Sequence, residues 1–204
     1  MLKLSPVSRL AGAILAVAAL LAACVPTSEH PILVPGAPTV DPDILGTWRG
    51  EVGEQDSILI FLDSREEADA GGMTLLLAAP AAPHEDSDPG WIYALALAAK
   101  VGDQRYLSIE WRSDGGKAVE PDMRGYHLYR YEIEEDGEMH LYGASEAELT
   151  ALHEQGKLEG TVSGSGVTRD LRITASSETL VKLLGEVDPE VVFSDLAGKL
   201  ARVK

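Results

Sequence analysis

The side chains that could carry nucleophilic, acid–base or metal chemistry are scattered along this 204-residue chain. A serine hydrolase of the α/β type needs a Gly-x-Ser-x-Gly turn, whereas Gly164-Ser165-Gly166 has another spacing and is typical of a flexible loop. The five histidines fall on separate predicted elements: His30, His84, His127, His140 and His153. His127 and His140 share one face of a predicted hairpin, but at about 3.3 Å per residue they lie roughly 20 Å apart, too far to share a metal. The pattern therefore predicts no enzyme, no metal site and no cofactor.

Two stretches concentrate carboxylates. Segment 84–88 (His-Glu-Asp-Ser-Asp) offers the oxygen ligands that Ca²⁺ prefers, without the spacing of a calcium-binding loop. Four further carboxylates crowd a hairpin, where two of them could exchange a proton with a substrate: Glu132, Glu134, Glu135 and Asp136. For both stretches we favour the simpler interpretation, a solvated acidic connection and a solvated hairpin tip.

Cys24 is the only cysteine, and it follows a segment typical of an export signal. Lys3 and Arg9 precede an uncharged apolar run over 10–23, which at about 14 residues suits a signal and is shorter than the roughly 20 residues that span a bilayer. The sequence Leu-Ala-Ala-Cys at 21–24 resembles the lipobox of bacterial lipoproteins. The resemblance implies that residues 1–23 are a signal peptide and that the Cys24 thiol is joined to a diacylglycerol. The alternative is an ordinary cleaved signal that ends near a cysteine.

The lipid attachment at Cys24 would anchor the protein to the membrane durably, because each buried methylene contributes about 0.8 kcal/mol and a bacterial lipoprotein carries two or three acyl chains. No other segment has the length or apolarity to cross a membrane. Val25 is not aspartate, which by resemblance to the enterobacterial sorting rule favours the outer membrane facing the periplasm. Since lipid occupies the only thiol, none remains for a disulfide, a metal or a nucleophile.

Without residues 1–23 the chain has 15 basic and 33 acidic residues, a net charge of −18 with histidine neutral. Such an acidic surface repels nucleic acid and anionic lipid head groups, so nucleic-acid binding is excluded. A cationic envelope partner or a divalent ion remains permitted. Solubility is the simpler explanation of the charge. The oligomeric state is left open.

Composition divides the exported chain into a tether and one domain. Residues 24–42 hold the lipidated cysteine and five prolines, which predicts a semi-rigid tether of up to roughly 50 Å at about 3.1 Å per residue. The alternative is that Ile32-Leu33-Val34 adds an edge strand. Residues 43–204 are expected to form a single β-rich globular domain, which is long enough to bury its own core.

Short alternating segments bounded by turn residues predict the fold class: β-rich (α+β), an antiparallel sheet or partly closed barrel of about eight or nine strands. The expected strands, after a start at 44–50, are 57–63, 73–78, 91–101, 106–112, 125–135, 138–143, 158–162 and 171–175. Two short helices are predicted over 146–155 and 177–185, packed on the sheet or plugging a barrel end. Ser145 and Glu148 form a capping box in the first, and Gly156 and Gly185 are plausible stops.

Turn chemistry predicts the register of two hairpins. Asp136-Gly137 favours a two-residue turn, which sets Ile133 opposite His140 and Tyr131 opposite Tyr142. In the other hairpin a three-residue turn at 102–104 pairs Leu97 with Ile109, and Leu95 with Trp111. A two-residue turn would set Leu97 against Ser108 and mix core with surface, so the longer turn is preferred.

Gly46-Thr47-Trp48 resembles the Gly-x-Trp motif on the first strand of lipocalins and related barrels. In those proteins the tryptophan packs across the closed end, often beneath an arginine from the last strands, here Arg172 or Arg202. A core tryptophan on a first strand is the alternative.

A second resemblance covers most of the domain. The segments 126–128, 175–180 and 192–193 look like those of a group of uncharacterised exported bacterial proteins. This resemblance implies no activity. The sequence thus predicts a lipoprotein of unknown molecular activity, a binding or structural envelope protein. The runner-up is a lipocalin-like carrier of a small apolar ligand, whose cavity would be lined or closed by five aromatic residues: Trp48, Trp91, Tyr93, Tyr129 and Tyr131.

Overall fold

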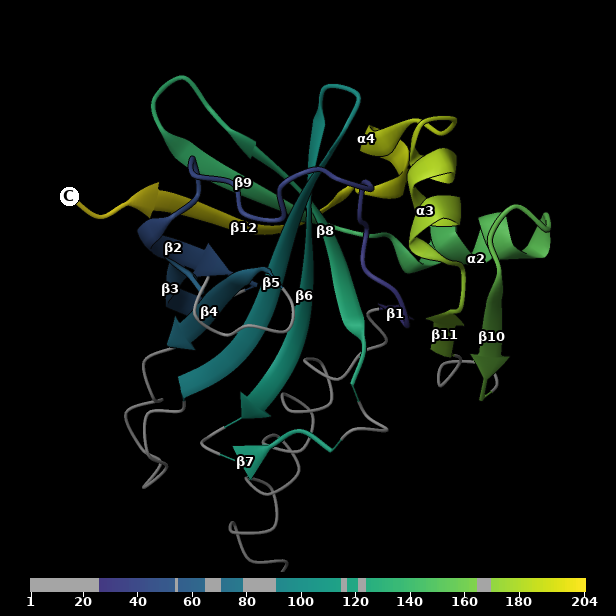
Figure 1. Ribbon diagram of the computed structural model, residues 1–204, viewed down its shortest axis with the longest axis horizontal. Helices are drawn as coiled ribbons and strands as arrows, with labels where there is room; N and C mark the ends of the chain where they lie inside the picture. The colour runs from purple at the N-terminus through teal and green to yellow at the C-terminus, as the bar shows by residue number, and fades with distance from the viewer. Residues whose placement is uncertain are drawn as a thin grey trace, which may run out of the picture.

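Eight antiparallel strands close into a barrel in the computed structural model, which describes residues 26–53, 55–64, 71–78, 91–114, 117–120, 124–164 and 170–204 (Figure 1). Around the barrel the strands are β2 (Gly46–Val52), β3 (Gln55–Asp63), β4 (Met73–Ala78), β5 (Trp91–Val101), β6 (Gln104–Asp114), β8 (Tyr126–Ile133), β9 (Glu138–Gly143) and β12 (Asp195–Arg202). In this order each strand pairs with the next, and β12 pairs with β2 to close the barrel. The β-rich fold class is confirmed, and the open question of sheet or barrel is resolved as a closed up-and-down barrel.

Short strands extend the barrel wall on both sides. On β8, the strand β1 (Thr27–Ser28) pairs with Tyr126 and His127, beyond the point where β9 ends opposite Tyr129. The sheet then continues through β11 (Asp170–Ile173) to β10 (Gly160–Ser163). On the other side, β7 (Lys117–Ala118) pairs with the end of β6.

Between β9 and β12 the described part of the chain forms three helices: α2 (Glu146–Glu154), α3 (Ser177–Leu184) and α4 (Pro189–Val192). The first two confirm the predicted helices, and the third was not predicted. Ser176 caps α3 by accepting a hydrogen bond from the Thr179 amide at 3.2 Å. Ser145 precedes α2, but its side chain makes no capping bond, so the predicted capping box with Glu148 is wrong. Among the residues that the structure describes, no helix is long and apolar enough to cross a bilayer.

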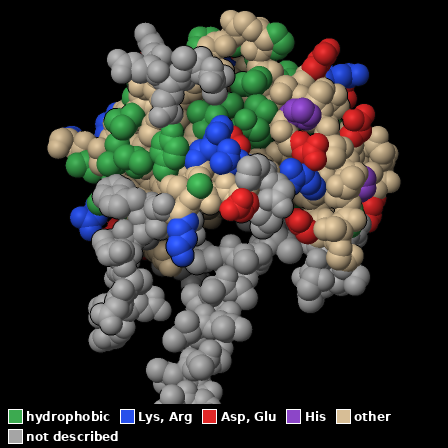
Figure 2. All heavy atoms as spheres, turned by 60° about the horizontal axis from the view of Figure 1, so that its bottom comes forward, with side chains coloured by type: hydrophobic (Ala, Val, Ile, Leu, Met, Phe, Trp, Pro, Cys, Tyr) green, Lys and Arg blue, Asp and Glu red, His purple; other side chains and the backbone are tan. Residues whose placement is uncertain are grey.

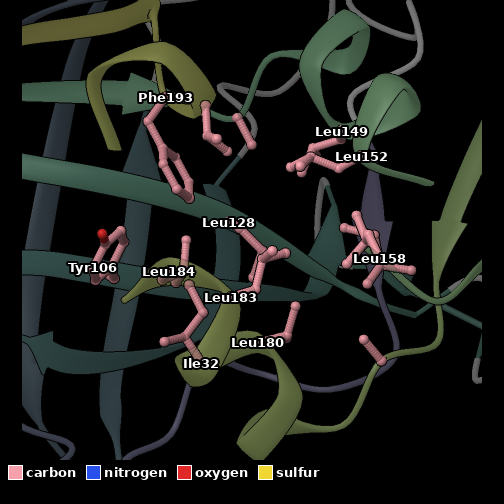
Figure 3. Close-up of a cluster of buried hydrophobic side chains, with 14 of the residues drawn as sticks. Ile32, Tyr106, Leu128, Leu149, Leu152, Leu158, Leu180, Leu183, Leu184 and Phe193 are labelled. Carbon is pink, nitrogen blue, oxygen red and sulfur yellow. The ribbon is translucent and has the colours of Figure 1, made fainter. Parts of the chain in front are cut away.

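Two buried clusters stabilise this arrangement. The inner one fills the barrel around Trp48, Phe61 and Tyr131. The outer one lies between the helices and the wall made by β5, β6 and β8, where Tyr106 and Phe193 meet with ring centroids 5.3 Å apart (Figure 3). The helices therefore cover the outside of the barrel, which decides between the two placements predicted for them.

Residues 26–42, for which composition predicts a tether, pack on the domain instead. Ile32 is fully buried, and its amide donates to the Ser108 hydroxyl at 2.9 Å. The Ser177 hydroxyl donates to the Pro31 carbonyl at 2.7 Å. Residues 32–34 form no strand, so the alternative of an edge strand there is wrong. The strand of this segment lies earlier, at β1. The prolines leave few amide donors, but apolar burial and contacts to side chains hold this segment in place, so it supplies no reach of 50 Å.

The register predicted for the β5–β6 hairpin is wrong. Val101 pairs with Gln104 across a two-residue turn, and Leu97 lies opposite Ser108. Gly102 adopts φ +60°, which suits such a turn. A three-residue turn is favoured only if one face of the hairpin meets water. Both faces are buried, and the Ser108 hydroxyl is satisfied by the passing segment at Ile32.

The register predicted for the β8–β9 hairpin is also wrong by one residue. Ile133 pairs with Met139 and Tyr131 with Leu141, across a three-residue loop. The Gly137 amide donates to the Glu134 carbonyl at 2.9 Å, and Gly137 has φ +85°, the geometry of a type I turn followed by a glycine bulge. A one-residue slip exchanges faces, so Tyr142 and His140 lie outside the barrel while Tyr131 and His127 face inward.

Candidate ligand-binding site

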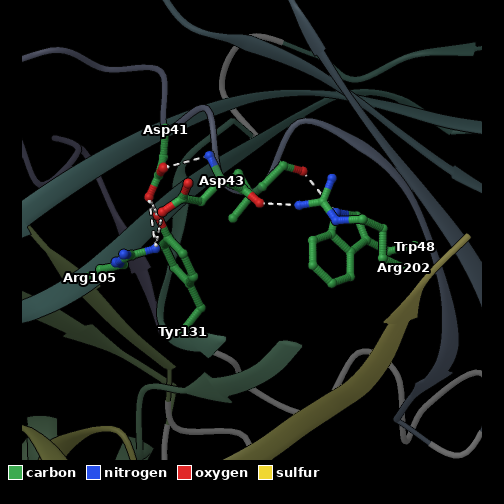
Figure 4. A network of polar contacts seen from close by, with 7 residues as sticks. Asp41, Asp43, Trp48, Arg105, Tyr131 and Arg202 are labelled. Carbon is green, nitrogen blue, oxygen red and sulfur yellow. Dashed lines mark hydrogen bonds and ion pairs between the residues drawn. The ribbon is translucent and has the colours of Figure 1, made fainter. Parts of the chain in front are cut away.

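One end of the barrel is sealed by Trp48 beneath Arg202. The indole is fully buried and donates from Nε1 to the Ile44 carbonyl at 2.8 Å. The Arg202 guanidinium lies 4.4 Å from the centroid of the indole ring, a cation–π contact, and donates to the carbonyls of Leu45 and Asp43 (Figure 4). Of the two arginines named from the sequence, Arg202 is therefore the one above Trp48.

The other arginine lies elsewhere. Arg172, on β11, pairs with Glu29 at 2.9 Å. It also donates to the Arg124 carbonyl at 3.2 Å. Its contacts therefore hold the strands beside the barrel, and it takes no part in the seal.

A polar network completes the sealed end. The Tyr131 hydroxyl donates to an Asp41 carboxylate oxygen at 2.6 Å, and Arg105 lies 3.5 Å from Asp41 and 3.0 Å from Asp43 (Figure 4). Burial and the Asp41 hydrogen bond raise the pKa of Tyr131, so its hydroxyl stays protonated as the donor. The chain before β2 is thus tied across the barrel end by groups that satisfy one another.

A pocket of about 260 Å³ lies beside this seal, between the segment 37–42 and the β5–β6 hairpin. Its wall is mostly apolar, with Val40 and Ala98 among the lining residues. Three of its polar lining residues, Asp41, Arg105 and Tyr131, already contact one another, and the fourth, Lys100, is exposed. Few polar groups therefore remain in this pocket to orient a ligand.

The other half of the barrel, which we call the mouth, has an aromatic and uncharged lining. Strand alternation directs Leu77, Ile92, Trp111, His127 and Tyr129 inward, and each is half-buried. The Trp111 and His127 rings lie 6.0 Å apart at 52°. Burial lowers the pKa of His127 and raises the pKa of Tyr129 to about 12. Both groups are therefore neutral near pH 7, and this lining suits an apolar molecule.

A buried arginine on the outer wall serves packing rather than the barrel interior. Arg130 is 4% exposed, donates to the Gln104 side chain at 3.2 Å and pairs with Glu132. Its Cζ lies 4.4 Å from the centroid of the Tyr142 ring. These contacts neutralise the charge where β8 and β9 meet the loop after α4.

The predicted cavity residues divide between the two faces of the barrel wall. Trp48, Tyr129 and Tyr131 face the interior. Tyr93 alternates with the inward Ala94 and faces outward. Residues 1–25, Cys24 among them, lie outside the described residues, as do the Trp91 side chain, segment 84–88 and residues 165–169.

The other candidate groups lie apart. The structure places His127 and His140 on opposite faces of the wall, against the prediction of a shared face. His140 contacts Glu138 at 2.5 Å, and His153 bonds the Leu158 carbonyl at 3.0 Å. Within the described ranges no three acidic, histidine or cysteine side chains gather as metal ligands.

Asp41, Arg105, Trp111 and His127 were not predicted to lie together in one barrel. The alternation of side chains on β6 and β8 could have indicated Trp111 and His127, because both face inward when the two strands are paired in the correct register.

Comparison with models of protein families, with curated proteins and with solved structures finds no match. The class that the geometry defines is a closed eight-stranded up-and-down barrel with one sealed end.

Proposed function

We propose that this protein is a lipid-anchored envelope lipoprotein whose barrel binds a small apolar ligand. One observation supports the proposal: the eight strands close into a barrel whose one end is sealed by Trp48 beneath Arg202. Small up-and-down barrels of eight strands can hold one small ligand. The resemblance of Gly46-Thr47-Trp48 to lipocalins supports the same role. We assign the protein binding and no reaction.

The lining determines the class of ligand. Recognition of a charged molecule needs a charged partner inside the barrel, whereas the inward groups of the mouth are apolar or neutral. Pockets for small molecules are mostly apolar with a few polar groups that fix orientation. His127 and Tyr129 are suited to that orienting role, because each combines a ring with a hydrogen-bonding atom.

Narrowing the mouth should weaken binding of a neutral fluorescent naphthylamine probe. Leu77 faces inward opposite Ile92, so Leu77→Trp should raise the probe's dissociation constant about tenfold, equivalent to about 1.4 kcal/mol. Fluorescence titration of the purified protein measures this. The adjacent Leu76 faces outward on the same strand, and Leu76→Trp should leave the constant within about twofold. Equal effects of the two variants, or no probe binding to the unaltered protein, would show that the barrel is not the binding site.

The anchor has its own test. Cys24→Ala should move the protein from the membrane fraction to the soluble fraction of its host and abolish lipid labelling, because the thiol that accepts the diacylglycerol is gone. Val25→Ala is the matched control and should stay in the membrane. If Cys24→Ala remains membrane-bound and labelled, the lipoprotein assignment is wrong. Separation of the two membranes then tests the proposed outer-membrane location facing the periplasm.

A further inference from the structure

The described chain begins at the rim of the barrel mouth. β1 pairs with β8 at Tyr126 and His127, and His127 is one of the inward residues of the mouth. β6 continues past this level, and β7 follows beside its end, so the mouth and the first described residues lie at the same end of the barrel (Figure 1). Figure 2, in which this end comes forward, shows apolar side chains gathered beside basic and acidic ones.

Burial and strand pairing hold the first described residues to the rim. Pro26 is buried, and β1 is paired on both edges, antiparallel to β8 and parallel to β11. The Glu29 amide donates to the Ile173 carbonyl at 2.9 Å, and the Glu29 carboxylate pairs with Arg172. The first described residues therefore cannot swing away from the mouth without breaking sheet pairing.

Covalent geometry then limits how far the anchor lies from the rim. Cys24 precedes Pro26 by two residues, and a fully extended chain covers at most about 3.6 Å per residue, so the two Cα atoms are separated by about 7 Å or less. The opposite end of the barrel is much farther away. β8 has eight residues, which at about 3.3 Å per residue places the β8–β9 turn more than 20 Å beyond Tyr126.

We propose that the anchored protein stands with its barrel mouth against the lipid bilayer and takes up its apolar ligand directly from the lipid leaflet. This inference rests on the proposed lipid anchor and apolar ligand. An apolar molecule that passes from the leaflet into the mouth avoids exposing its surface to water, which is the unfavourable step for such a ligand. The sealed end, with the acidic β8–β9 turn, then faces away from the membrane.

Site-specific fluorescence quenching tests this orientation. The lipidated full chain is reconstituted into phosphatidylcholine vesicles that contain a doxyl-labelled lipid, with bimane on one engineered cysteine. Lys117→Cys places the label beside the mouth, and Asp136→Cys places it on the β8–β9 turn; both native side chains are exposed. We expect doxyl lipid to reduce the Lys117→Cys emission at least twofold and to leave the Asp136→Cys emission unchanged.

Vesicle flotation separates the failure of this inference from the failure of the anchor. If the unaltered lipidated protein does not float with the vesicles, the proposed anchor fails, and the orientation fails with it. If the protein floats and the Asp136→Cys label is quenched as strongly as the Lys117→Cys label, the anchor stands and the orientation is overturned. Flotation together with selective quenching at Lys117→Cys supports both.

Discussion

Trp48→Ala should lower the free energy of unfolding by about 3–5 kcal/mol, the range for removing a large buried aromatic side chain. The indole is fully buried, donates a hydrogen bond to the Ile44 carbonyl and lies beneath Arg202. Alanine would leave a cavity in the seal and remove the ring that faces the guanidinium. Urea denaturation followed by circular dichroism measures the loss.

Two variants give this measurement its control. Trp48→Phe keeps an aromatic ring and loses the hydrogen bond, so we expect a smaller loss. Trp111→Ala also removes a tryptophan side chain, but Trp111 lies half-buried in the mouth, where less apolar area is covered. It should lower the free energy of unfolding by less than half as much as Trp48→Ala. Equal losses for Trp48→Ala and Trp111→Ala would contradict the description of one sealed end and one mouth.

Gly50→Ala should also destabilise the barrel strongly, by about 3 kcal/mol or more, because it forces a carbon into the backbone of the next strand. A Cβ at Gly50 would stand 1.9 Å from the Lys199 carbonyl oxygen and 2.9 Å from the Leu200 Cα. Backbone atoms cannot move aside as a flexible side chain does. The β2–β12 pairing that closes the barrel would have to open locally.

Gly143→Ala is the matched control for this substitution. Gly143 also lies in a barrel strand, but a Cβ there would meet its nearest neighbour, the Asp195 carbonyl oxygen, at an ordinary 3.6 Å. We expect its midpoint of urea denaturation to stay close to that of the unaltered protein. If both variants unfold at the same urea concentration, the close approach of β2 and β12 is not what requires Gly50.

Strand positions could be predicted from this sequence because alternation and turn residues act locally. The bounds of β4, β5 and β9 agree with the prediction, whereas both predicted registers were wrong. The β8–β9 prediction rests on the two-residue turn that Asp136-Gly137 favours, whereas the hairpin forms a three-residue loop. The β5–β6 prediction rests on pairing apolar with apolar positions, which assumes that one face of the hairpin meets water. Leu97 and Ser108 break that assumption, since helices and the segment around Ile32 bury the outer face as well.

Closure of the barrel could not be predicted because its last strand was not recognised. β12 reads Asp-Leu-Ala-Gly-Lys-Leu-Ala-Arg, with few of the β-branched and aromatic residues that favour strands. Its stability comes from neighbours on both sides, β9 and β2. Such pairing depends on tertiary contacts, which a local sequence pattern does not predict.

The candidate site was predictable only where a short motif marked it. Gly46-Thr47-Trp48 pointed to Trp48 and, through resemblance, to Arg202. Asp41 was assigned to a tether, so its hydrogen bond with Tyr131 could not be foreseen. Trp111 and His127 meet only when the correct β6–β8 pairing is known.

The pairing of the first barrel strand with the last has a consequence for how this protein folds. β2 and β9 each present an unpaired edge until β12, the last of the eight barrel strands in chain order, has paired with them. Open edges are templates for pairing with other chains, and contacts between distant segments form slowly. Any state of the chain in which β12 is unpaired therefore has two exposed strand edges, and pairing of Asp195–Arg202 covers both.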